Sequence, residues 1–506
     1  MLSLYNFGHT RKKAFSITAA KRISLVIRLL ILASVIAFTA IAAVTVFTIV
    51  SMGILPAKYF SLVVAGVVVL AGVGFLMFFI SKKHKVPAII TSIILLVISG
   101  FKCLGLSYLF TTRGFFSQTK AREYYIEKYS VVVLKESGFN KLEDLNGKTC
   151  ASYIDTVLSY DQAFGDLKEA IEFTTDIKNT YVNAAFAVVN RQADFFLVNN
   201  SYIDLIDDFI KDFSEKIKII HTIEIKLYDT IELSDVDVLN EPFNIFISGI
   251  DVEGDISTVS RSDVNMIVTV NPKTHKILLT GIPRDFYVQL HGTTGTKDKL
   301  THSGIFGPKM TVKTVEDFLN ININYYVRIN FTSVIRLVNA IGGIYITPDF
   351  TFYRTQDGEN CYYYENVTNW YDGACALRYA RERKAYGTGD MHRVQNQQQV
   401  MTAIIDKLSS SEILKNYTNI LAAVQDNFET NIPENKFYQL INNQLESMPR
   451  WNVESYAMEG YNSHNQVYSY DLPETGEYNN YYYVMEPNYE TVGIAKEKIK
   501  NAFAGE

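Results

Sequence analysis

The stretch "SRSDVNMIVTVNPKTHKILLTGIPRD" occupies residues 260–285 and decides the fold. Two apolar, β-branched runs in it, "VNMIVTV" and "KILLTGI", flank the polar segment "NPKTH", which is the pattern of two neighbouring strands. A third such run, "FNIFISGID", lies shortly before them and ends at Asp251. Amphipathic stretches at 311–320 and 331–341 predict helices, so we expect a mixed α/β domain in which helices cover a buried sheet, with "IGGIYITPDF" adding a further strand.

Charged side chains stand at the ends of these predicted strands. They are Asp251 after the first strand, Arg261 and Asp263 before the second, and Arg284 and Asp285 after the third. Side chains two positions apart on a strand point the same way, so Arg261 and Asp263 are expected to face one pocket. Any single Arg–Asp pair is most often an ordinary salt bridge. Several such pieces in an otherwise acidic domain favour a binding site.

A second stretch, "RYARERKAYGTGDMHRVQNQQQV" at residues 378–400, crowds positive charge around one carboxylate, Asp390. Its arginines are Arg378, Arg381, Arg383 and Arg393. Guanidinium groups so close to one another repel unless an anion lies among them. The stretch therefore predicts an anion-binding site.

The local structure of this stretch can also be predicted. If "YARER" is extended, Arg381 and Arg383 share one side of the chain. Residues 390–410 are expected to form a helix, with Asp390 at the positive end of its dipole. Arg393 and Gln397 then follow Asp390 at i+3 and i+7, on one face of that helix.

The residue types indicate the chemistry. Arginine presents a planar fork that matches phosphate oxygens, so several arginines imply a multiply charged phosphate ligand. Two aspartates beside them would bind a hard divalent cation such as Mg²⁺, with phosphate oxygens completing its coordination shell. A cation with arginine clamps is how phosphoryl transfer is stabilised. The sequence has neither a Gly-rich P-loop nor a GxSxG elbow, so neither a nucleotide-driven enzyme nor a serine hydrolase is expected.

Length and charge limit the class of protein. A chain of 506 residues with 48% hydrophobic content is expected to form two or three folded parts. Residues 1–120 contain 13 Lys and Arg and no Asp or Glu, whereas the rest carries 35 Lys and Arg against 53 Asp and Glu. Nucleic-acid binders derive their affinity from neutralising phosphates, so this acidic part is not expected to bind nucleic acid.

Three apolar runs near the N-terminus predict a membrane anchor. They occupy residues 23–50, 59–80 and 86–110, and each exceeds the ~20 residues that a helix needs to cross the hydrocarbon core. Three in succession are typical of a polytopic anchor rather than a cleavable signal peptide. Basic residues gather before the first run and between the second and third. The positive-inside rule therefore places residues 1–22 in the cytoplasm and the chain after about residue 111 outside the cell.

Two folded parts are expected after the spans. The first is a small α/β accessory domain at 115–235, and the second is a larger domain with a C-terminal extension at 240–506. In the first, "GFNKLEDLNGKTCASY" resembles a stretch of periplasmic solute-binding proteins, and no chemistry is assigned to it. Outside the cell cysteines can oxidise, and the sequence leaves open whether Cys361 and Cys375 form a bridge.

Together these segments resemble the LytR–CpsA–Psr family of Gram-positive cell-envelope proteins. The resemblance covers about residues 243–410 and rests on "SRSDVNMIVTVNP", "LLTGIPRDFYV", "KLTHSGIFG" and "ALRYARERKAYGTGDMHRVQNQQQV". Three spans followed by an accessory domain are similar to the streptococcal capsule branch. The family implies an αβα sandwich with a mixed central sheet and an apolar tunnel for a polyprenyl chain. It also implies transfer of a glycan from a polyprenyl-pyrophosphate carrier to peptidoglycan.

The resemblance implies roles for single residues. Asp251 and Asp263 would hold Mg²⁺, with Mn²⁺ as an alternative, and Asp285 and Asp390 would support the site structurally. The pyrophosphate would be bound by Arg261, Arg284, Lys299, Arg381, Arg383, Arg393 and Gln397. The catalytic residues would be Asp263, Arg284, Arg381 and Arg383. Many members have arginine directly before the glutamine, whereas this chain has Asn396, so one pyrophosphate contact is expected to be weaker or replaced.

Three functions stay open at this point. The first is a Mg²⁺-dependent phosphotransferase that attaches capsular polysaccharide, or another anionic glycan, to peptidoglycan. The second is a membrane regulator of capsule synthesis that senses the lipid-linked glycan, although about 22 residues before the first span leave no room for a DNA-binding domain. The third is a pyrophosphatase that uses the same site with water as the acceptor. The expected partners are polyprenyl-pyrophosphate-linked glycan, peptidoglycan, membrane lipid and other capsule-assembly membrane proteins.

Overall fold

The computed structural model describes most of the chain. The described residues are 2–119, 124–153, 158–228, 231, 236–250, 256, 258–356, 359–385, 387, 389–410, 419–420, 422–423, 428–470 and 481–506. The predicted metal ligand Asp251 lies outside them. The chain divides into two compact units, one of Met1–Ser117 with Glu434–Met448 and one of Gln118–Pro433 with Pro449–Glu506.

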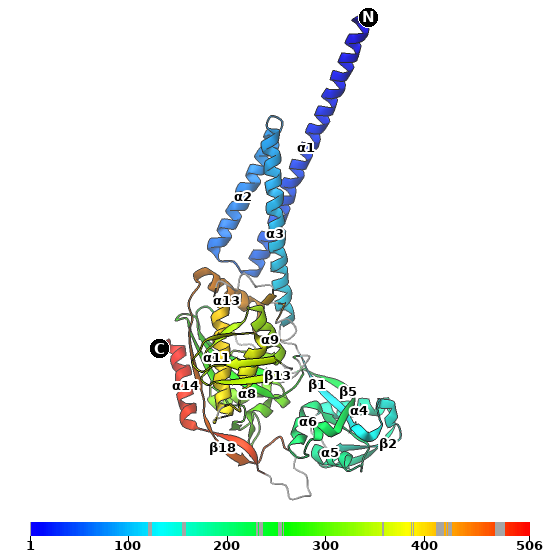
Figure 1. Ribbon diagram of the computed structural model, residues 1–506, viewed down its shortest axis with the longest axis vertical. Helices are drawn as coiled ribbons and strands as arrows, with labels where there is room; N and C mark the ends of the chain where they lie inside the picture. The colour runs from blue at the N-terminus through cyan, green and yellow to red at the C-terminus, as the bar shows by residue number, and fades with distance from the viewer. Residues whose placement is uncertain are drawn as a thin grey trace. The chain divides into compact units, whose positions relative to one another are not determined.

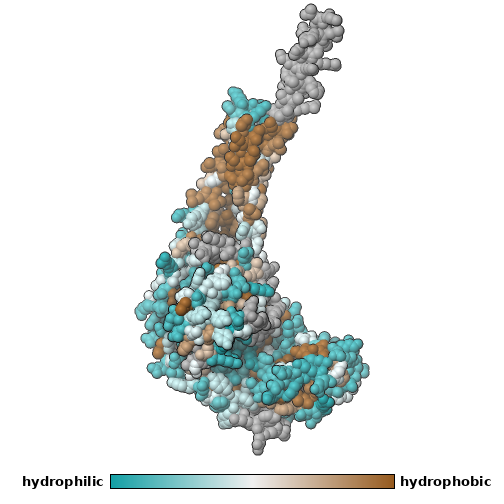
Figure 2. Space-filling model, viewed as in Figure 1, coloured by the Kyte–Doolittle hydropathy of each residue, from teal (hydrophilic) through white to brown (hydrophobic). Residues whose placement is uncertain are grey.

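The first unit is built on three long helices, α1 (Leu2–Met52), α2 (Ala57–Ile80) and α3 (Lys85–Thr119). Each contains a stretch long and apolar enough to cross a membrane, namely Leu25–Met52, Ala57–Ile80 and Lys85–Gly114. Their apolar side chains mostly face outward, and Figure 2 shows the hydrophobic residues gathered over them. The three predicted apolar helices are therefore confirmed. Helix α13 (Glu434–Ser447) also belongs to this unit.

The second unit begins with a five-stranded sheet of strand order β3-β2-β4-β1-β5. Its strands are β1 (Tyr125–Leu134), β2 (Lys148–Tyr153), β3 (Phe173–Lys178), β4 (Phe195–Asn199) and β5 (Ile217–Leu227). Its helices are α4 (Leu158–Ala170), α5 (Tyr181–Val189), α6 (Asn200–Asp207) and α7 (Phe213–Lys216). We call this part, residues 125–227, the accessory domain. Fully buried β-strand residues such as Val132 and Phe196 form its core with α5.

The central sheet of the second unit has six strands in the order β16-β11-β6-β7-β8-β17. They are β6 (Phe243–Ile250), β7 (Ser262–Asn271), β8 (Lys276–Ile282), β11 (Tyr325–Asn330), β16 (Phe428–Thr430) and β17 (Asn452–Ala457). Strand β7 pairs antiparallel with β6 and β8, whereas β11 is parallel to β6 and β17 is parallel to β8. The three strands predicted from the sequence are thus the centre of a mixed sheet.

Helices cover both faces of this sheet. They are α8 (Pro308–Leu319) and α14 (Tyr489–Ala504) on one face, and α9 (Phe331–Ala340), α10 (Gly373–Arg381) and α11 (Asp390–Leu408) on the other. Alternation along the strands separates the faces, because Phe246 packs into the core with α8 and α14 while Ile247 faces the other side. The expected αβα sandwich is therefore confirmed (Figure 1).

Among the described residues, four short two-stranded ladders lie outside the two large sheets. They are β9 (Tyr287–Val288) with β10 (Asp298–Lys299), β12 (Ile344–Ile346) with β15 (Asn369–Tyr371), β13 (Phe352–Gln356) with β14 (Glu359–Tyr363), and β18 (Gly460–Asn465) with β19 (Tyr482–Pro487). The predicted strand in "IGGIYITPDF" is β12, but it pairs with β15 and not with the central sheet. A disulfide joins Cys361 in β14 to Cys375 in α10 and fastens this hairpin to the helix.

Candidate anion-binding site

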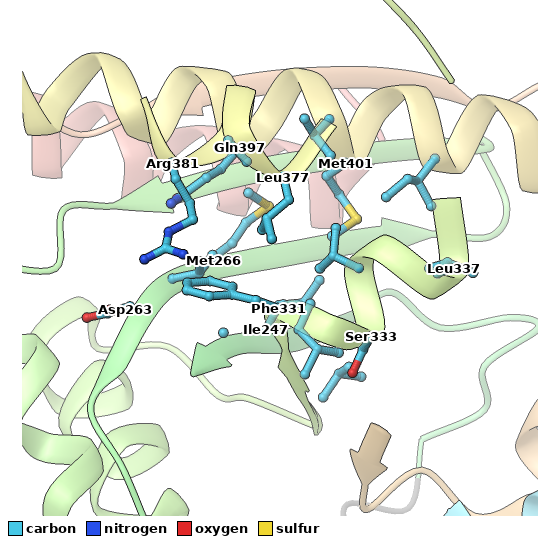
Figure 3. Close-up of a pocket in the computed structure, with 18 of the residues that line it drawn as sticks. Ile247, Asp263, Met266, Phe331, Ser333, Leu337, Leu377, Arg381, Gln397 and Met401 are labelled. Atoms are coloured by element: carbon cyan, nitrogen blue, oxygen red, sulfur yellow. The ribbon is translucent and has the colours of Figure 1, made fainter. Parts of the chain in front are cut away.

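An apolar cavity of about 390 Å³ lies between the central sheet and helices α9, α10 and α11. Its walls are mostly aliphatic side chains and methionines, such as Ile247, Met266 and Met401. The polar residues that line it are Asp263, Arg284, Ser333, Arg381, Arg383, Arg393 and Gln397. Figure 3 shows Asp263 and Arg381 at one end of the cavity, with Met401 and Leu337 farther along it. This arrangement fits an amphiphilic ligand with an anionic head and an apolar tail.

Arg284 and Asp263 form a close ion pair at the polar end. Nη1 of Arg284 donates to Oδ1 of Asp263 over 2.8 Å, and the Thr301 hydroxyl donates to the same oxygen over 3.1 Å. Burial alone would raise the pKa of Asp263, but the charges of Arg284 and Arg393 lower it below its ordinary value. The carboxylate is therefore ionised at neutral pH and can face a cation or position an arginine.

Asp390 begins α11, as predicted, and is surrounded by arginines. Its Oδ1 lies 2.7 Å from Nη2 of Arg393, 3.8 Å from Nη1 of Arg383 and 4.0 Å from Nε of Arg284. Burial raises the pKa of Asp390 above its ordinary value even though Arg393 opposes the shift. The preceding residue, Gly389, has a positive φ of 53°, which suits the glycine found there. Asp390 therefore holds the arginines together and is itself largely buried.

The "YARER" segment is not extended as expected, because α10 continues to Arg381 and only Glu382 turns the chain into an extended conformation. Glu382 is 4% exposed, forms an ion pair with Arg354 and accepts a hydrogen bond from the Ala385 amide over 2.7 Å. The two flanking arginines nevertheless both line the cavity. One buried carboxylate thus anchors the segment between Arg381 and Arg383, whose side chains line the cavity.

Helix α11 packs directly on β8. A side chain in place of Gly281 would put its Cβ 2.2 Å from Val394, so only glycine permits this approach. Nε2 of Gln398 donates to the carbonyl oxygens of Leu279 over 3.0 Å and Tyr456 over 2.8 Å. Asn396 is fully buried and donates to the Tyr379 carbonyl oxygen over 3.1 Å. The residue that departs from the family pattern therefore points into the helix packing.

Three predicted cations lie elsewhere. Nη1 of Arg378 donates to Sγ of Cys361 over 2.8 Å, so this arginine belongs to the hairpin contact and not to the cavity. Arg261 precedes β7 at a register irregularity, so strand alternation does not carry it to the side of Asp263. Its Nη2 lies 3.8 Å from Oδ2 of Asp204 in the accessory domain. Lys299 contacts the Tyr470 hydroxyl over 3.5 Å.

Some buried polar atoms at the cavity have no hydrogen-bond partner within the described part of the chain. Nε of Arg284 and Nε of Arg393 are both buried without such a partner. Buried donors in proteins are usually hydrogen-bonded, so a bound oxygen atom would supply the missing partner. Together with the adjacent exposed guanidinium of Arg383, these atoms define a site for an anion with several oxygens.

The residues present suit a magnesium ion only in part. Among the described residues, no group of three or more His, Cys, Asp or Glu side chains converges as a protein metal cage would. Asp263 offers a buried, ionised carboxylate next to the arginines, and Asp285 is also buried, with its Oδ2 3.7 Å from Nε of Arg284. Mg²⁺ is commonly held by one or two carboxylates together with substrate phosphates, so this donor set fits a metal that arrives with a phosphate ligand.

Three supporting residues escaped sequence reasoning. Thr301 holds Asp263, Glu382 anchors the two arginines and Gln398 fastens α11 to two strands. The single acid between two bases in "RER" was a signal for Glu382, because a lone carboxylate among cations needs a partner of its own. Thr301 and Gln398 carry no comparable sequence signal.

Fold and site define a class. This is an αβα domain with an apolar cavity whose mouth carries arginines, and three helices of membrane-spanning length precede it in the sequence. The model of the LytR_cpsA_psr family matches residues 214–486, more than half of the chain. The chain belongs to this family.

Named relatives are similar to roughly half of the chain. The polyisoprenyl-teichoic acid–peptidoglycan teichoic acid transferase TagU of Bacillus cereus is 33% identical over 239 residues, which are 47% of this chain and 76% of the relative. TagU of Enterococcus faecalis is 39% identical over 214 residues, 41% of this chain and 68% of the relative. The crystal structure of B. subtilis TagV is 29% identical, with a TM-score of 0.43, over 52% of this chain and 98% of the other.

Proposed function

We propose that this protein is a membrane-anchored transferase that moves an anionic glycan from a polyprenyl-pyrophosphate carrier to peptidoglycan, with capsular polysaccharide as the glycan. The observation that carries the proposal is the set of arginines at the mouth of an apolar cavity. The cavity suits the polyprenyl chain, and the arginines suit the pyrophosphate to which it is joined. The two TagU relatives are named polyisoprenyl-teichoic acid–peptidoglycan teichoic acid transferases.

The proposed reaction is a substitution at the phosphorus that bears the glycan, with the other phosphate of the pyrophosphate as part of the leaving group. A hydroxyl of peptidoglycan attacks the phosphorus that bears the glycan, and the bond from this phosphorus to the bridging oxygen breaks. Polyprenyl phosphate leaves, a phosphodiester forms and the hydroxyl proton is released. Charge grows on the bridging oxygen and on the phosphate oxygens, so cations fixed beside them lower the barrier.

Single residues take separate parts in this reaction. Arg381 and Arg383 bind the pyrophosphate oxygens, and Gln397 adds a neutral contact from α11. Arg284 is held by its hydrogen bond to Asp263 and lies between the carboxylates of the site and the bound ligand. Arg393 is fixed by its ion pair with Asp390 and adds positive charge to the site from α11. Apolar walls exclude water from one side of the head group, which strengthens these interactions.

A divalent cation, Mg²⁺ or Mn²⁺, belongs to this proposal. Asp263 would hold it together with Asp251, which lies outside the described residues. When bound, such a cation neutralises phosphate charge and polarises the attacked phosphorus. The carboxylate of Asp263 keeps its negative charge for this purpose because Arg284 and Arg393 lower its pKa.

The three apolar helices support a place for this chemistry at the outer face of a cell membrane. Basic residues before the first helix and between the second and third favour a cytoplasmic N-terminus, with the sheet domains outside. A polyprenyl carrier keeps its tail in lipid, so an enzyme that accepts it benefits from membrane attachment.

The test supplies the purified full-length protein with a lipid-linked glycan, Mg²⁺ and peptidoglycan. We expect glycan to become covalently attached to peptidoglycan and polyprenyl phosphate to be released in equal amount. Release of polyprenyl phosphate without attachment would show that water is the acceptor. Tight binding with neither product would identify a sensor of the lipid-linked glycan and overturn the transferase.

A further inference from the structure

The segment from Asp298 to His302 contacts the candidate site on one side and residues 469–470 on the other. The hydroxyl of Thr301 donates to Asp263 over 3.1 Å, and the Thr301 amide donates to the Arg284 carbonyl oxygen over 2.8 Å. Two positions earlier, Nζ of Lys299 donates to the Tyr470 hydroxyl over 3.5 Å. One short segment thus connects the Asp263–Arg284 pair with Tyr470.

Tyr470 carries this connection into the accessory domain. Its hydroxyl donates to the carboxylate of Asp208, the residue that follows α6. Its ring is 6% exposed and packs edge-on against Phe209, with ring centroids 5.3 Å apart. The Lys299 ammonium also lies 5.6 Å from the centroid of this ring. A buried tyrosine is therefore held by a carboxylate of one domain while it contacts a cation of the other.

A second link runs beside the first. The Tyr181 hydroxyl of the accessory domain donates to the Ser469 carbonyl oxygen over 3.1 Å. The Ser469 amide in turn donates to Oδ2 of Asp298 over 2.9 Å, and its hydroxyl lies 2.9 Å from Nδ1 of His302. Residues 469–470 are therefore fixed between the accessory domain and the segment that supports Asp263.

Arg261 stands in a similar relation to α6. Its Nη2 lies 3.8 Å from Oδ2 of Asp204, one turn before Asp208. Arg261 and Lys299 are the two predicted pyrophosphate-binding cations that do not line the cavity. Both face carboxylates from the end of the same accessory-domain helix.

We propose that the accessory domain is a positioning part of the site. Asp208, acting through Tyr470, holds the Lys299 ammonium where it meets the anionic head of the ligand, and Asp204 attracts Arg261 directly from 3.8 Å. Asp208 and Tyr470 are positioning residues, since they act on the ligand through Lys299. This inference rests on the proposed function, because it takes the ligand to be a pyrophosphate.

The charged groups around Lys299 make the proposal testable through the pH dependence of ligand binding. Burial lowers the pKa of Lys299, Arg261 lowers it too, and Asp285, Asp208 and Asp298 raise it. Burial likewise raises the pKa of its hydroxyl partner Tyr470, with Asp208 adding to the shift. Removing the charge of Asp208 therefore makes Lys299 lose its proton at lower pH.

The experiment measures binding of geranylgeranyl pyrophosphate with Mg²⁺ to the full-length protein in detergent, by titration calorimetry between pH 7 and pH 10. Tyr470→Phe removes the hydroxyl link and keeps the ring, and we expect about three- to tenfold weaker binding at neutral pH. Asp208→Asn should bind the ligand more weakly and lose binding at lower pH than the wild type. Because both changes break one link, the double variant should lose less than the product of the two single effects.

Controls separate positioning from general damage. Asp166→Asn removes an exposed carboxylate from α4 of the same domain and should bind like the wild type. Lys299→Arg, which keeps its charge up to pH 10, should abolish the pH shift that Asp208→Asn causes. A purely structural role would lower the melting temperature without moving this pH dependence.

Two failures have different meanings. Wild-type binding by Tyr470→Phe and by Asp208→Asn at every pH would overturn the inference, while loss of binding in an Arg381→Ala, Arg383→Ala variant would still support the proposed function. Absence of binding by the wild-type protein would overturn the proposed function and this inference with it.

Discussion

Nη1 of Arg284 donates to Oδ1 of Asp263 over 2.8 Å, and this pair joins the residues that follow β8 to the start of β7. The side chains are 20% and 12% exposed, so each charge depends on the other for compensation. Burial would raise the pKa of Asp263, and Arg284 and Arg393 reverse the direction of the shift. Stability of the ligand-free domain is therefore tied to the same residues that are proposed to bind the ligand.

The first prediction concerns Arg284→Ala. Removing one partner of a buried pair strands the other, at a cost of about 3 kcal/mol in the free energy of unfolding. In the wild type the folded pKa of Asp263 is lowered, so the pair's contribution is present above the unfolded pKa, about 3.9, and is lost as pH falls through the folded pKa. In the variant burial is opposed only by Arg393 and the Thr301 hydrogen bond, so we expect the folded pKa of Asp263 to rise above the unfolded one and stability to be lost as pH rises between the two values. Melting temperatures between pH 3 and pH 7 measure both trends.

The control for this prediction is Arg284→Ala combined with Asp263→Asn. It removes the stranded charge, so most of the lost stability should return at pH 7 and the inverted pH trend should vanish. Equal melting curves for the wild type and Arg284→Ala at all pH values would show that the pair contributes nothing to folding.

The second prediction concerns Arg381→Ala with Arg383→Ala. Both side chains are exposed at the cavity, and their loss should leave the melting temperature nearly unchanged. A hydrogen bond to a charged group contributes ~1.5 kcal/mol at the low end of its range, which suits exposed groups, so two would give about a hundredfold loss in affinity for a polyprenyl pyrophosphate. Lysine at both positions should restore little of this affinity, because a point charge cannot grip two oxygens as a fork does.

Lys384→Ala is the matched control, since Lys384 is an exposed cation directly beside this pair. Calorimetric titration should give the wild-type dissociation constant for it. A large fall in melting temperature for the double arginine variant, with affinity preserved, would mean that the two arginines are structural.

Apolar periodicity was sufficient to predict the strands at the centre of the sheet and the helix that begins at Asp390. Each of these elements is buried on a continuous face, so hydrophobic spacing records its structure directly. The same patterns predicted the strand β12 but not its partner, because a three-residue strand pairs wherever its short ladder finds a partner. The fold class could thus be predicted, while the pairing of the short two-stranded ladders could not.

Sequence position alone does not decide which of the predicted cations line the cavity, since Arg284 and Arg383 lie just outside regular elements and still line it. Arg393 and Gln397 both reach the cavity because helical spacing keeps them on one face. Arg261 does not, because it precedes β7, and Arg378 does not, because the disulfide-bonded hairpin takes its side chain. The alternation of side chains holds only within a strand. Outside it, contacts with other parts of the fold decide where a side chain points.

The third prediction concerns the close approach of α11 to the sheet. Gly281→Ala should destabilise the domain by ~1–3 kcal/mol, since its Cβ would meet Val394 at 2.2 Å and Gln398 at 3.1 Å. Val394→Ala in the same chain opens space for the new methyl group and should recover part of the loss. Denaturant titration of the three variants measures this, and additive losses in the double variant would contradict the steric explanation.

The fourth prediction concerns the Cys361–Cys375 disulfide. The two cysteines are 14 residues apart, and closing a loop of this length stabilises a folded domain by ~3 kcal/mol. Replacing both by alanine should lower the melting temperature by several degrees and make it insensitive to reductant. The wild type should melt earlier with reductant than without, and identical curves would show that the thiols are free.

The last prediction asks whether the apolar cavity receives the tail of the ligand. Met401 of α11 lines the cavity and lies along it from the polar end in Figure 3. Met401→Trp adds bulk to a space of about 390 Å³, so it should shorten the apolar segment that can enter. Each methylene kept out of the cavity costs ~0.8 kcal/mol, and exclusion of two gives about a tenfold loss in affinity for geranylgeranyl pyrophosphate. Affinity for inorganic pyrophosphate should stay unchanged, because the arginines are untouched. Gln395→Trp, on the exposed face of the same helix, should leave both affinities as in the wild type. If Met401→Trp lowers neither affinity, or lowers both equally, the tail does not lie in this cavity and the arginines serve a ligand without one.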